Sequence, residues 1–162
     1  MPVLKYKLFA DYFQLLLMDE YCEDDFSTIW DADASERMLA LGATSASIGT
    51  LRNVDVDVEV HVLQAEPAVS IDDVDHGALC SFAIPSGRLV VLGCTEFKPA
   101  AARVSIQPGS YRVLTTVTGV DTIEYESDPA SDLYSVYLWP GLPIEPRLLK
   151  HWKLGQEAQR RS

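Results

Sequence analysis

The chain has 162 residues, 48% of them hydrophobic and 23% charged, which is typical of a globular domain and excludes a disordered or collagen-like chain. Its 13 basic and 24 acidic residues give a formal net charge of −11, which argues against direct binding to nucleic acid. The longest apolar run is far too short to span a bilayer, and the first residues lack the apolar core of an export signal. We therefore expect a cytoplasmic protein without membrane contact.

The first third of the chain predicts two strands, a loop and a helix. Residues 3–9 and 13–18 are rich in aromatic and aliphatic side chains and predict short strands, and the acidic stretch 19–27 predicts an exposed loop. Asp33 is followed three residues later by Glu36, which is the spacing of a capping box ahead of an apolar face. We therefore predict one short helix near residues 33–41, ended by Gly42.

From residue 45 onward the pattern is mostly that of strands. Valines at 54, 56, 58, 60 and 62 alternate with polar residues, which is the period of a strand with one buried face. Further strands are predicted at 45–51, 78–84, 88–93, 103–106, 111–117, 122–126 and 133–139. Turns containing Pro and Gly, such as Pro85-Ser86-Gly87, separate most of them. The fold class predicted is mainly β, a two-layer antiparallel β-sandwich.

The charge layout suggests how the chain divides. Residues 1–146 carry nearly all the acidic side chains and form the predicted single sandwich domain, whereas residues 147–162 hold five of the 13 basic residues and only Glu157. We expect this basic C-terminal tail to form a short helix or to fray, with disorder after Gly155.

The cysteines and the known catalytic motifs give little support for an enzyme. Cys22, Cys80 and Cys94 are widely spaced, so neither a disulfide framework nor a zinc site follows, and reduced thiols are expected. A nucleophilic Cys94 with His61 or His76 as its base is the minority interpretation. Dinucleotide, phosphate-loop, zinc-protease and hydrolase motifs are absent from the sequence, so we expect no enzyme, no catalytic residues and no cofactor.

One acidic cluster has the residue types of a metal site. Asp72, Asp73, Asp75 and His76 place three carboxylates and an imidazole within five residues, a set that could hold a divalent cation. The cluster lacks the alternating Asp positions, the turn glycine and the distal Glu of the helix-loop-helix calcium site. A solvated acidic loop is therefore favoured, with metal binding as the alternative.

A second acidic feature lies on the valine-rich strand. Asp55, Asp57 and Glu59, called the acidic row below, share the face opposite the valines, at intervals of about 6.5–7 Å. That interval resembles the spacing of successive phosphates along a nucleic-acid strand. The row could therefore stand in for a nucleic-acid backbone in front of a basic protein groove, although a merely solvated strand face shows the same pattern. Asp24 and Asp25, in the loop 19–27, are predicted to assist.

An ordered series of segments resembles the competence protein J family. The series is Tyr12-Phe13-Gln14-Leu15, then Trp30 ahead of the acidic helix start, then residues 45–51 (SASIGTL) and the strand that alternates Val with Asp. It covers roughly the first 60 residues; later strands are similar only in rhythm, and residues 38–42 depart from the family pattern. Members are small inhibitors of a nuclease that works in DNA uptake. The resemblance implies a shared sandwich fold and, as an expectation, an inhibitory activity.

The leading hypothesis from the sequence is a non-catalytic protein-binding module. It would be an inhibitor or immunity-type protein whose acidic row, with Asp24 and Asp25, covers the cationic groove of a basic nuclease or toxin. Two alternatives stay open. One is a sandwich that binds a small ligand or a metal, or acts as an enzyme, through Asp72–His76 or Cys94. The other is a homo-oligomer in which the basic tail of one subunit lies on the acidic body of another.

Overall fold

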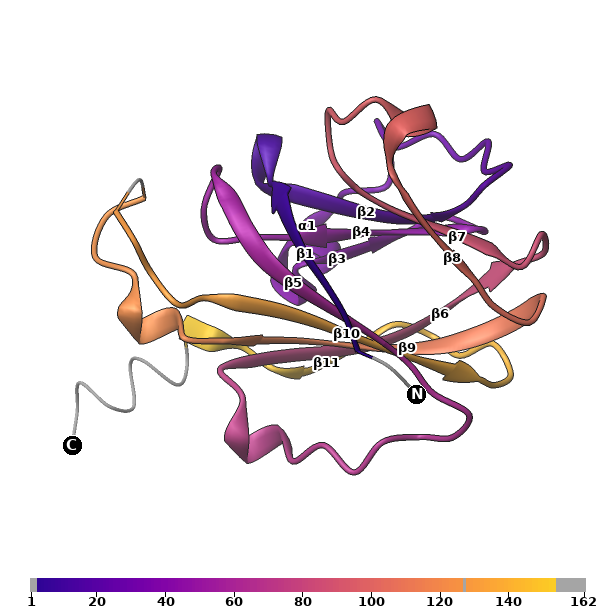
Figure 1. The fold of residues 1–162 in the computed structure, drawn as a ribbon. Helices are drawn as coiled ribbons and strands as arrows, with labels where there is room; N and C mark the ends of the chain where they lie inside the picture. The colour runs from indigo at the N-terminus through magenta and orange to yellow at the C-terminus, as the bar shows by residue number, and fades with distance from the viewer. Residues whose placement is uncertain (1–2, 127, 154–162) are drawn as a thin grey trace.

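The computed structural model describes residues 3–126 and 128–153, and in this part of the chain eleven strands form two sheets that lie face to face (Figure 1). The six-stranded sheet contains, in spatial order, β1 (Val3–Phe9), β5 (Asp55–Val62), β10 (Leu133–Pro140), β9 (Gly109–Thr118), β6 (His76–Ile84) and β11 (Arg147–Lys150). The five-stranded sheet contains β3 (Leu39–Leu41), β4 (Ser45–Gly49), β2 (Gln14–Asp19), β7 (Arg88–Gly93) and β8 (Ala102–Ser105). The predicted mainly-β sandwich with one short helix is confirmed.

One strand pair differs from a wholly antiparallel arrangement. β5 and β10 run parallel, with Asp57 opposite Leu133 and His61 opposite Tyr137, whereas the other neighbours are antiparallel. A parallel pair needs a long connection between its strands. Here the connection from β5 to β10 contains the strands β6, β7, β8 and β9. β5 consequently lies between the first strand of the chain and one of the last.

The core is formed by the alternating strand residues that face inward. Val56, Val58 and Val60 of β5 are almost completely buried, and they belong to the same core cluster as Leu15 and Leu17 of β2 in the other sheet. The intervening residues of β2, Leu16 and Met18, belong to a second cluster on the outer face of the five-stranded sheet, with Phe26 of the loop 20–31 packed against it. β2 is therefore buried on both faces, which explains its unbroken apolar run.

The helix is shorter than the predicted range. α1 spans Ala32–Arg37 and begins where the side chain of Asp31 accepts a hydrogen bond from the Ala34 amide at 2.8 Å, so Asp31 and not Asp33 is the cap. It ends at Met38, which adopts the left-handed conformation, and β3 follows at once. The apolar residues 39–41 thus belong to a strand at the sheet edge, and Gly42 lies beyond it.

Two further segments differ from the predicted elements. Residues 122–126 form no strand; a single 3-10 turn (Val120–Thr122) leads into a loop, whose backbone carbonyls at Glu126 and Asp128 are bound by the buried Arg52. At the other end, the first four residues of the basic tail form β11, which pairs with β6. The expected disorder after Gly155 falls outside the described residues.

The segment that joins β5 to β6 runs along the side of the six-stranded sheet that faces away from the other sheet (Figure 1). The side chain of Lys150 in β11 donates to the carbonyl of Val74 in this segment at 2.8 Å. The amide of Trp152 donates to Nδ1 of the buried His76 at 3.3 Å. Within the described residues, none of the helices has the length and apolar character needed to cross a membrane.

Candidate functional site

The acidic row lies on the outer face of the six-stranded sheet, where the strand period places it. Asp55 and Asp57 are exposed and Glu59 is half-buried, while the valines between them face the core. The Lys7 ammonium lies 3.8 Å from Asp57, Lys5 is opposite Glu59 in the strand register, and the His61 ring lies 3.8 Å from Glu59. Asp55 instead faces Phe9 on β1, so the excess of negative charge is greatest at the Asp55 end.

A second group of carboxylates, which the sequence did not suggest, joins this end of the row. The loop 119–132 approaches the start of β5, and Asp55, Asp57 and Asp128 line one open hollow of about 360 Å³ together with Lys7. Glu126 of the same loop accepts a hydrogen bond from the Asn53 amide at 3.1 Å. We call Asp55, Asp57, Glu126 and Asp128 the acidic end; it gathers four carboxylates from two separate segments.

A buried ion pair holds the loop against β5. Arg52 and Asp132 are both almost inaccessible to solvent, and the guanidinium meets the carboxylate through two nitrogens at 2.6 and 3.1 Å. The Tyr134 hydroxyl donates to Asp132 at 2.8 Å and accepts from the Leu51 amide at 3.0 Å. The hydrogen bonds to Asp132 raise the pKa of Arg52. Because these residues lie some 80 positions apart, no local pattern could have indicated the pair.

Asp24 and Asp25 lie away from the acidic row and have structural partners of their own. The Asp24 carboxylate accepts hydrogen bonds from the Thr44 amide at 3.0 Å and the Ser45 hydroxyl at 2.6 Å, at the start of β4 in the five-stranded sheet. Burial alone would raise the pKa of Asp24, but these hydrogen bonds outweigh it and the pKa is lowered. Asp25 binds the amide and hydroxyl of Ser27, which lower its pKa. The structure does not bring these two residues next to the row.

The four candidate metal ligands have different surroundings. Asp72 and Asp73 are exposed, and Asp75 accepts a hydrogen bond from the Val120 amide at 3.0 Å. Both ring nitrogens of His76 are occupied, Nε2 by the Arg37 carbonyl at 2.7 Å and Nδ1 by the Trp152 amide. Among the described residues, no group of three or more His, Cys, Asp or Glu side chains is arranged to hold a metal ion.

The cysteines do not have the surroundings of activated nucleophiles. Burial raises the pKa of the Cys80 thiol to about 12. Burial, and then the charge of Asp11, raise the pKa of Cys94. A raised thiol pKa lowers the fraction of reactive thiolate. In the described part of the chain, no hydrogen bond joins Cys94 to a histidine.

The connection between β1 and β2 forms an exposed aromatic corner. Tyr12 and Phe13 are 68% and 45% exposed, and both adopt the left-handed conformation, with φ of 56° and 59°. This conformation costs a residue other than glycine about 1–3 kcal/mol, so the surrounding contacts must enforce it. The Tyr12 amide donates to Asp11, and the Phe13 carbonyl accepts from the Thr50 amide at 2.9 Å.

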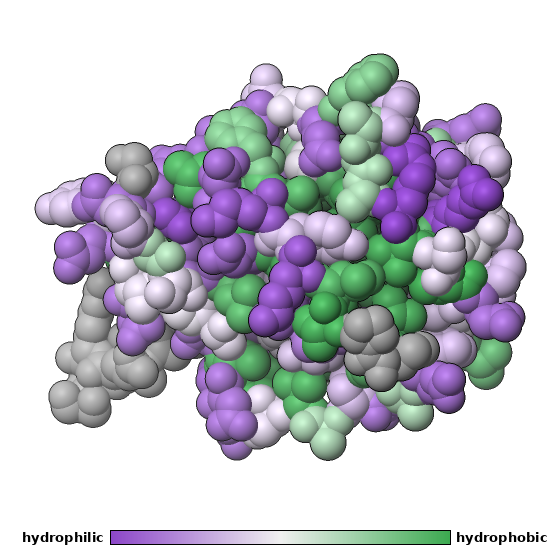
Figure 2. All heavy atoms as spheres, viewed as in Figure 1, coloured by the Kyte–Doolittle hydropathy of each residue, from purple (hydrophilic) through white to green (hydrophobic). Residues whose placement is uncertain are grey.

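A small hollow lies beside this corner, where the loop 20–31 and α1 meet the start of β2. It measures about 240 Å³, and Tyr12, Phe13, Trp30, Ser35 and Met38 are among its lining residues. The Trp30 indole N–H donates to the Gln14 side-chain oxygen at 3.2 Å, which fixes the indole. Figure 2 shows that hydrophobic side chains lie beside strongly hydrophilic ones over the face of the molecule seen in this view.

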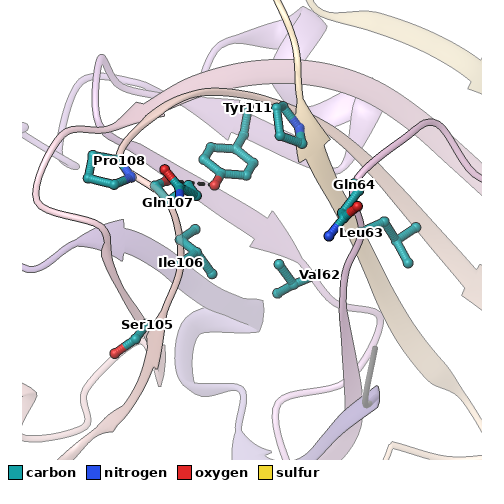
Figure 3. A pocket seen from close by; sticks show the side chains of 9 residues that line it. Val62, Leu63, Gln64, Ser105, Ile106, Gln107, Pro108 and Tyr111 are labelled. Atoms are coloured by element: carbon teal, nitrogen blue, oxygen red, sulfur yellow. Dashed lines mark hydrogen bonds between the residues drawn. The ribbon is translucent and has the colours of Figure 1, made fainter.

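A larger, mostly apolar cavity opens between the two sheets on the side where β8 faces β5 and β10 (Figure 3). It has a volume of about 440 Å³ and includes Val62, Ile106, Pro108 and Tyr111 in its lining. The Tyr111 hydroxyl donates to the Gln107 carbonyl at 2.6 Å. None of the described residues that line it is acidic, basic, a histidine or a cysteine; Ser105 and Tyr111 supply its hydroxyl groups.

Comparison with known proteins gives likeness in structure but not in sequence. No family model matches the chain, and no curated protein matches it in sequence. Among solved structures, the chain is similar to ComJ, the inhibitor of the DNA-degrading activity of NucA from Bacillus subtilis, with a TM-score of 0.65 and 11% identity over 87% of this chain and 96% of ComJ. It is also similar to the crocagin biosynthetic gene J product, with a TM-score of 0.60 and 23% identity over 87% of this chain and 98% of the other.

These likenesses extend over nearly the whole sandwich. The resemblance suggested by the first 60 residues is therefore confirmed as a shared fold, which also includes the later strands. At this level of identity, a common fold carries no residue roles from one protein to the other.

Proposed function

We propose that this protein is a non-catalytic binding module that inhibits a basic nuclease or toxin by covering its cationic substrate groove. The observation that carries the proposal is the fold shared with ComJ, a protein that inhibits a DNA-degrading enzyme. The net charge of −11 also supports the proposal, because a negatively charged protein is attracted to a cationic groove.

The acidic end is the surface we propose for contact. Lys7 lies 3.8 Å from Asp57 and lines the same hollow as Asp55 and Asp128, so one exposed ammonium faces three carboxylates there, and Glu126 adds a fourth next to Asn53. Exposed ion pairs contribute little to affinity, whereas a concentration of one sign of charge accelerates encounter with an oppositely charged partner. We accordingly expect the acidic end to act mainly on the association rate. Asp24 and Asp25 would contribute only through the long-range field.

The experiment begins with capture of partners from host lysate on the tagged full chain, at low and at high salt. We expect a basic nuclease or toxin to elute as salt rises and its cleavage of DNA to be inhibited at a one-to-one ratio. Asp55→Asn/Asp57→Asn should slow association about tenfold. The matched control is Asp72→Asn/Asp73→Asn, which changes the net charge equally on an exposed segment outside the acidic end and should have a smaller effect.

Two results would contradict this mechanism. Inhibition that is equally strong at high salt, or equally impaired by both double variants, would show that the acidic end is not the contact surface. Recovery of the protein alone under both conditions would favour the small-ligand alternative. The apolar cavity between the sheets is the observation that supports this second function, and thermal shift with apolar metabolites and with metal ions would test it.

A further inference from the structure

The aromatic corner has the composition of an interface anchor. Tyr and Trp are enriched among the residues that dominate binding energy, because they bury a large area with few rotatable bonds. Tyr12 and Phe13 are nevertheless largely exposed, and their backbone is held in an unfavourable conformation. Tyr12 is 68% exposed, so its side-chain contacts within this chain do not offset the energy of the strained backbone.

The corner is continuous with the acidic end. The side-chain oxygen of Asn53 accepts from the Phe13 amide at 3.4 Å, and the Asn53 amide donates to Glu126 at 3.1 Å. Phe9, at the end of β1, is 47% exposed and lies directly opposite Asp55. A partner that lies on the acidic end would therefore meet aromatic side chains at its border.

The chemistry of the hollow favours a cationic side chain. Tyr12, Phe13 and Trp30 supply aromatic rings and Met38 a polarizable thioether, and none of the described residues that line the hollow is basic. Asp11 and Asp31 are the sequence neighbours of Tyr12 and Trp30; the Asp11 carboxylate accepts from the Thr95 hydroxyl at 3.0 Å, and the Asp31 carboxylate caps α1. A volume of about 240 Å³ is below that of usual small-molecule sites and is suited to one amino-acid side chain. Guanidinium is planar and weakly hydrated, so it stacks on aromatic rings better than ammonium does.

We propose that the aromatic corner anchors the interface and that its hollow receives an arginine side chain of the partner protein. The inference rests on the proposed function in one respect, which is that the partner is a cationic protein. The acidic end then guides the approach, and the stacked arginine slows dissociation.

A direct test uses N-acetyl-arginine methylamide as the probe and the citrulline analogue, which has nearly the same shape without the charge, as its control. The readout is the indole N–H resonance of Trp30 in ¹⁵N-labelled full-length protein, identified by its loss in Trp30→Phe. We expect a saturable shift with the arginine probe, a much smaller one with citrulline, and loss of the response in Tyr12→Gly. Glycine accepts the backbone angle at position 12, so this variant should stay folded.

The matched control is Tyr21→Ala, which removes a comparably exposed aromatic ring that does not line the hollow and should leave the response unchanged. With a captured partner, Tyr12→Gly should raise the Kd about 30-fold, the loss typical of an anchor residue, and mainly through faster dissociation.

The results separate this proposal from the proposed function. No saturable shift with arginine, or an equal shift with citrulline, would overturn the arginine site even if a nuclease is inhibited through the acidic end. A shift that depends on Tyr12 and on the probe's charge would support the site even if no nuclease or toxin is captured. A Tyr12→Gly variant that binds the captured partner as tightly as the wild type would overturn the role as anchor.

Discussion

Replacing Asp132 by Asn should destabilise the protein strongly, because it leaves the Arg52 guanidinium buried without its counter-ion. Removing one member of a buried pair typically costs about 3–5 kcal/mol. Arg52 would keep the carbonyls of Asp128 at 2.9 Å and Glu126 at 3.3 Å, so we expect a loss near the lower value, about 3 kcal/mol. That is a large share of the 5–15 kcal/mol by which domains are usually stable.

Urea unfolding followed by tryptophan fluorescence measures this loss as a shift of the midpoint at constant slope. The matched control is Asp57→Asn, which breaks an ion pair whose side chains are 66% and 58% exposed and should cost less than about 1 kcal/mol. Tyr134→Phe offers a milder change; it removes only the hydroxyl between Asp132 and the Leu51 amide and should cost about 1–3 kcal/mol. If Asp132→Asn cost no more than Asp57→Asn, the buried pair would not be what fixes the loop 119–132.

Three further outcomes are expected. Tyr12→Gly should stabilise the protein by about 1 kcal/mol in the same urea assay, because glycine relieves the left-handed strain; destabilisation would show that the Tyr12 side chain contributes more than its backbone costs. Stability should fall as the pH drops below about 6.5, by at most ~1.4 kcal/mol per unit, because burial lowers the pKa of His76 and the unfolded chain takes up the proton first. Urea unfolding at pH values between about 6.5 and 5 measures this slope, and His76→Gln should flatten it. Iodoacetamide should label Cys80 only after denaturation, since its thiol is fully buried; rapid labelling of the native protein at Cys80, located by mass spectrometry, would contradict the packing of β6.

The sequence predicts most of the sandwich because its strands carry their own pattern. The alternation of Val56, Val58 and Val60 with carboxylates determines both the strand and its buried face. Residues 39–41 have no such pattern and look like the continuation of a helix; they form β3 because β4 is available as a neighbour. Residues 122–126 look like a strand, but the buried Arg52 binds the backbone where that strand would end.

The sequence predicts only part of the candidate site. Local alternation of Val and Asp indicates Asp55 and Asp57, and recognising it needs no knowledge of the fold. Asp128 joins them only because Arg52 and Asp132, 80 positions apart, meet in the interior. Long-range pairs of this kind carry no local signature, and a single sequence has no record of which distant residues change together.

The central position of β5 also governs the order in which the chain can fold. β5 can pair with β1 once residues 3–62 have been synthesised. Its other edge stays unpaired until β10, which begins more than 70 residues after the end of β5, joins the sheet. Such distant pairing slows folding and leaves an edge that could join a second chain. Charged side chains on a waiting strand oppose that error, so Asp55, Asp57 and Glu59 would act as gatekeepers against aggregation before they meet any partner.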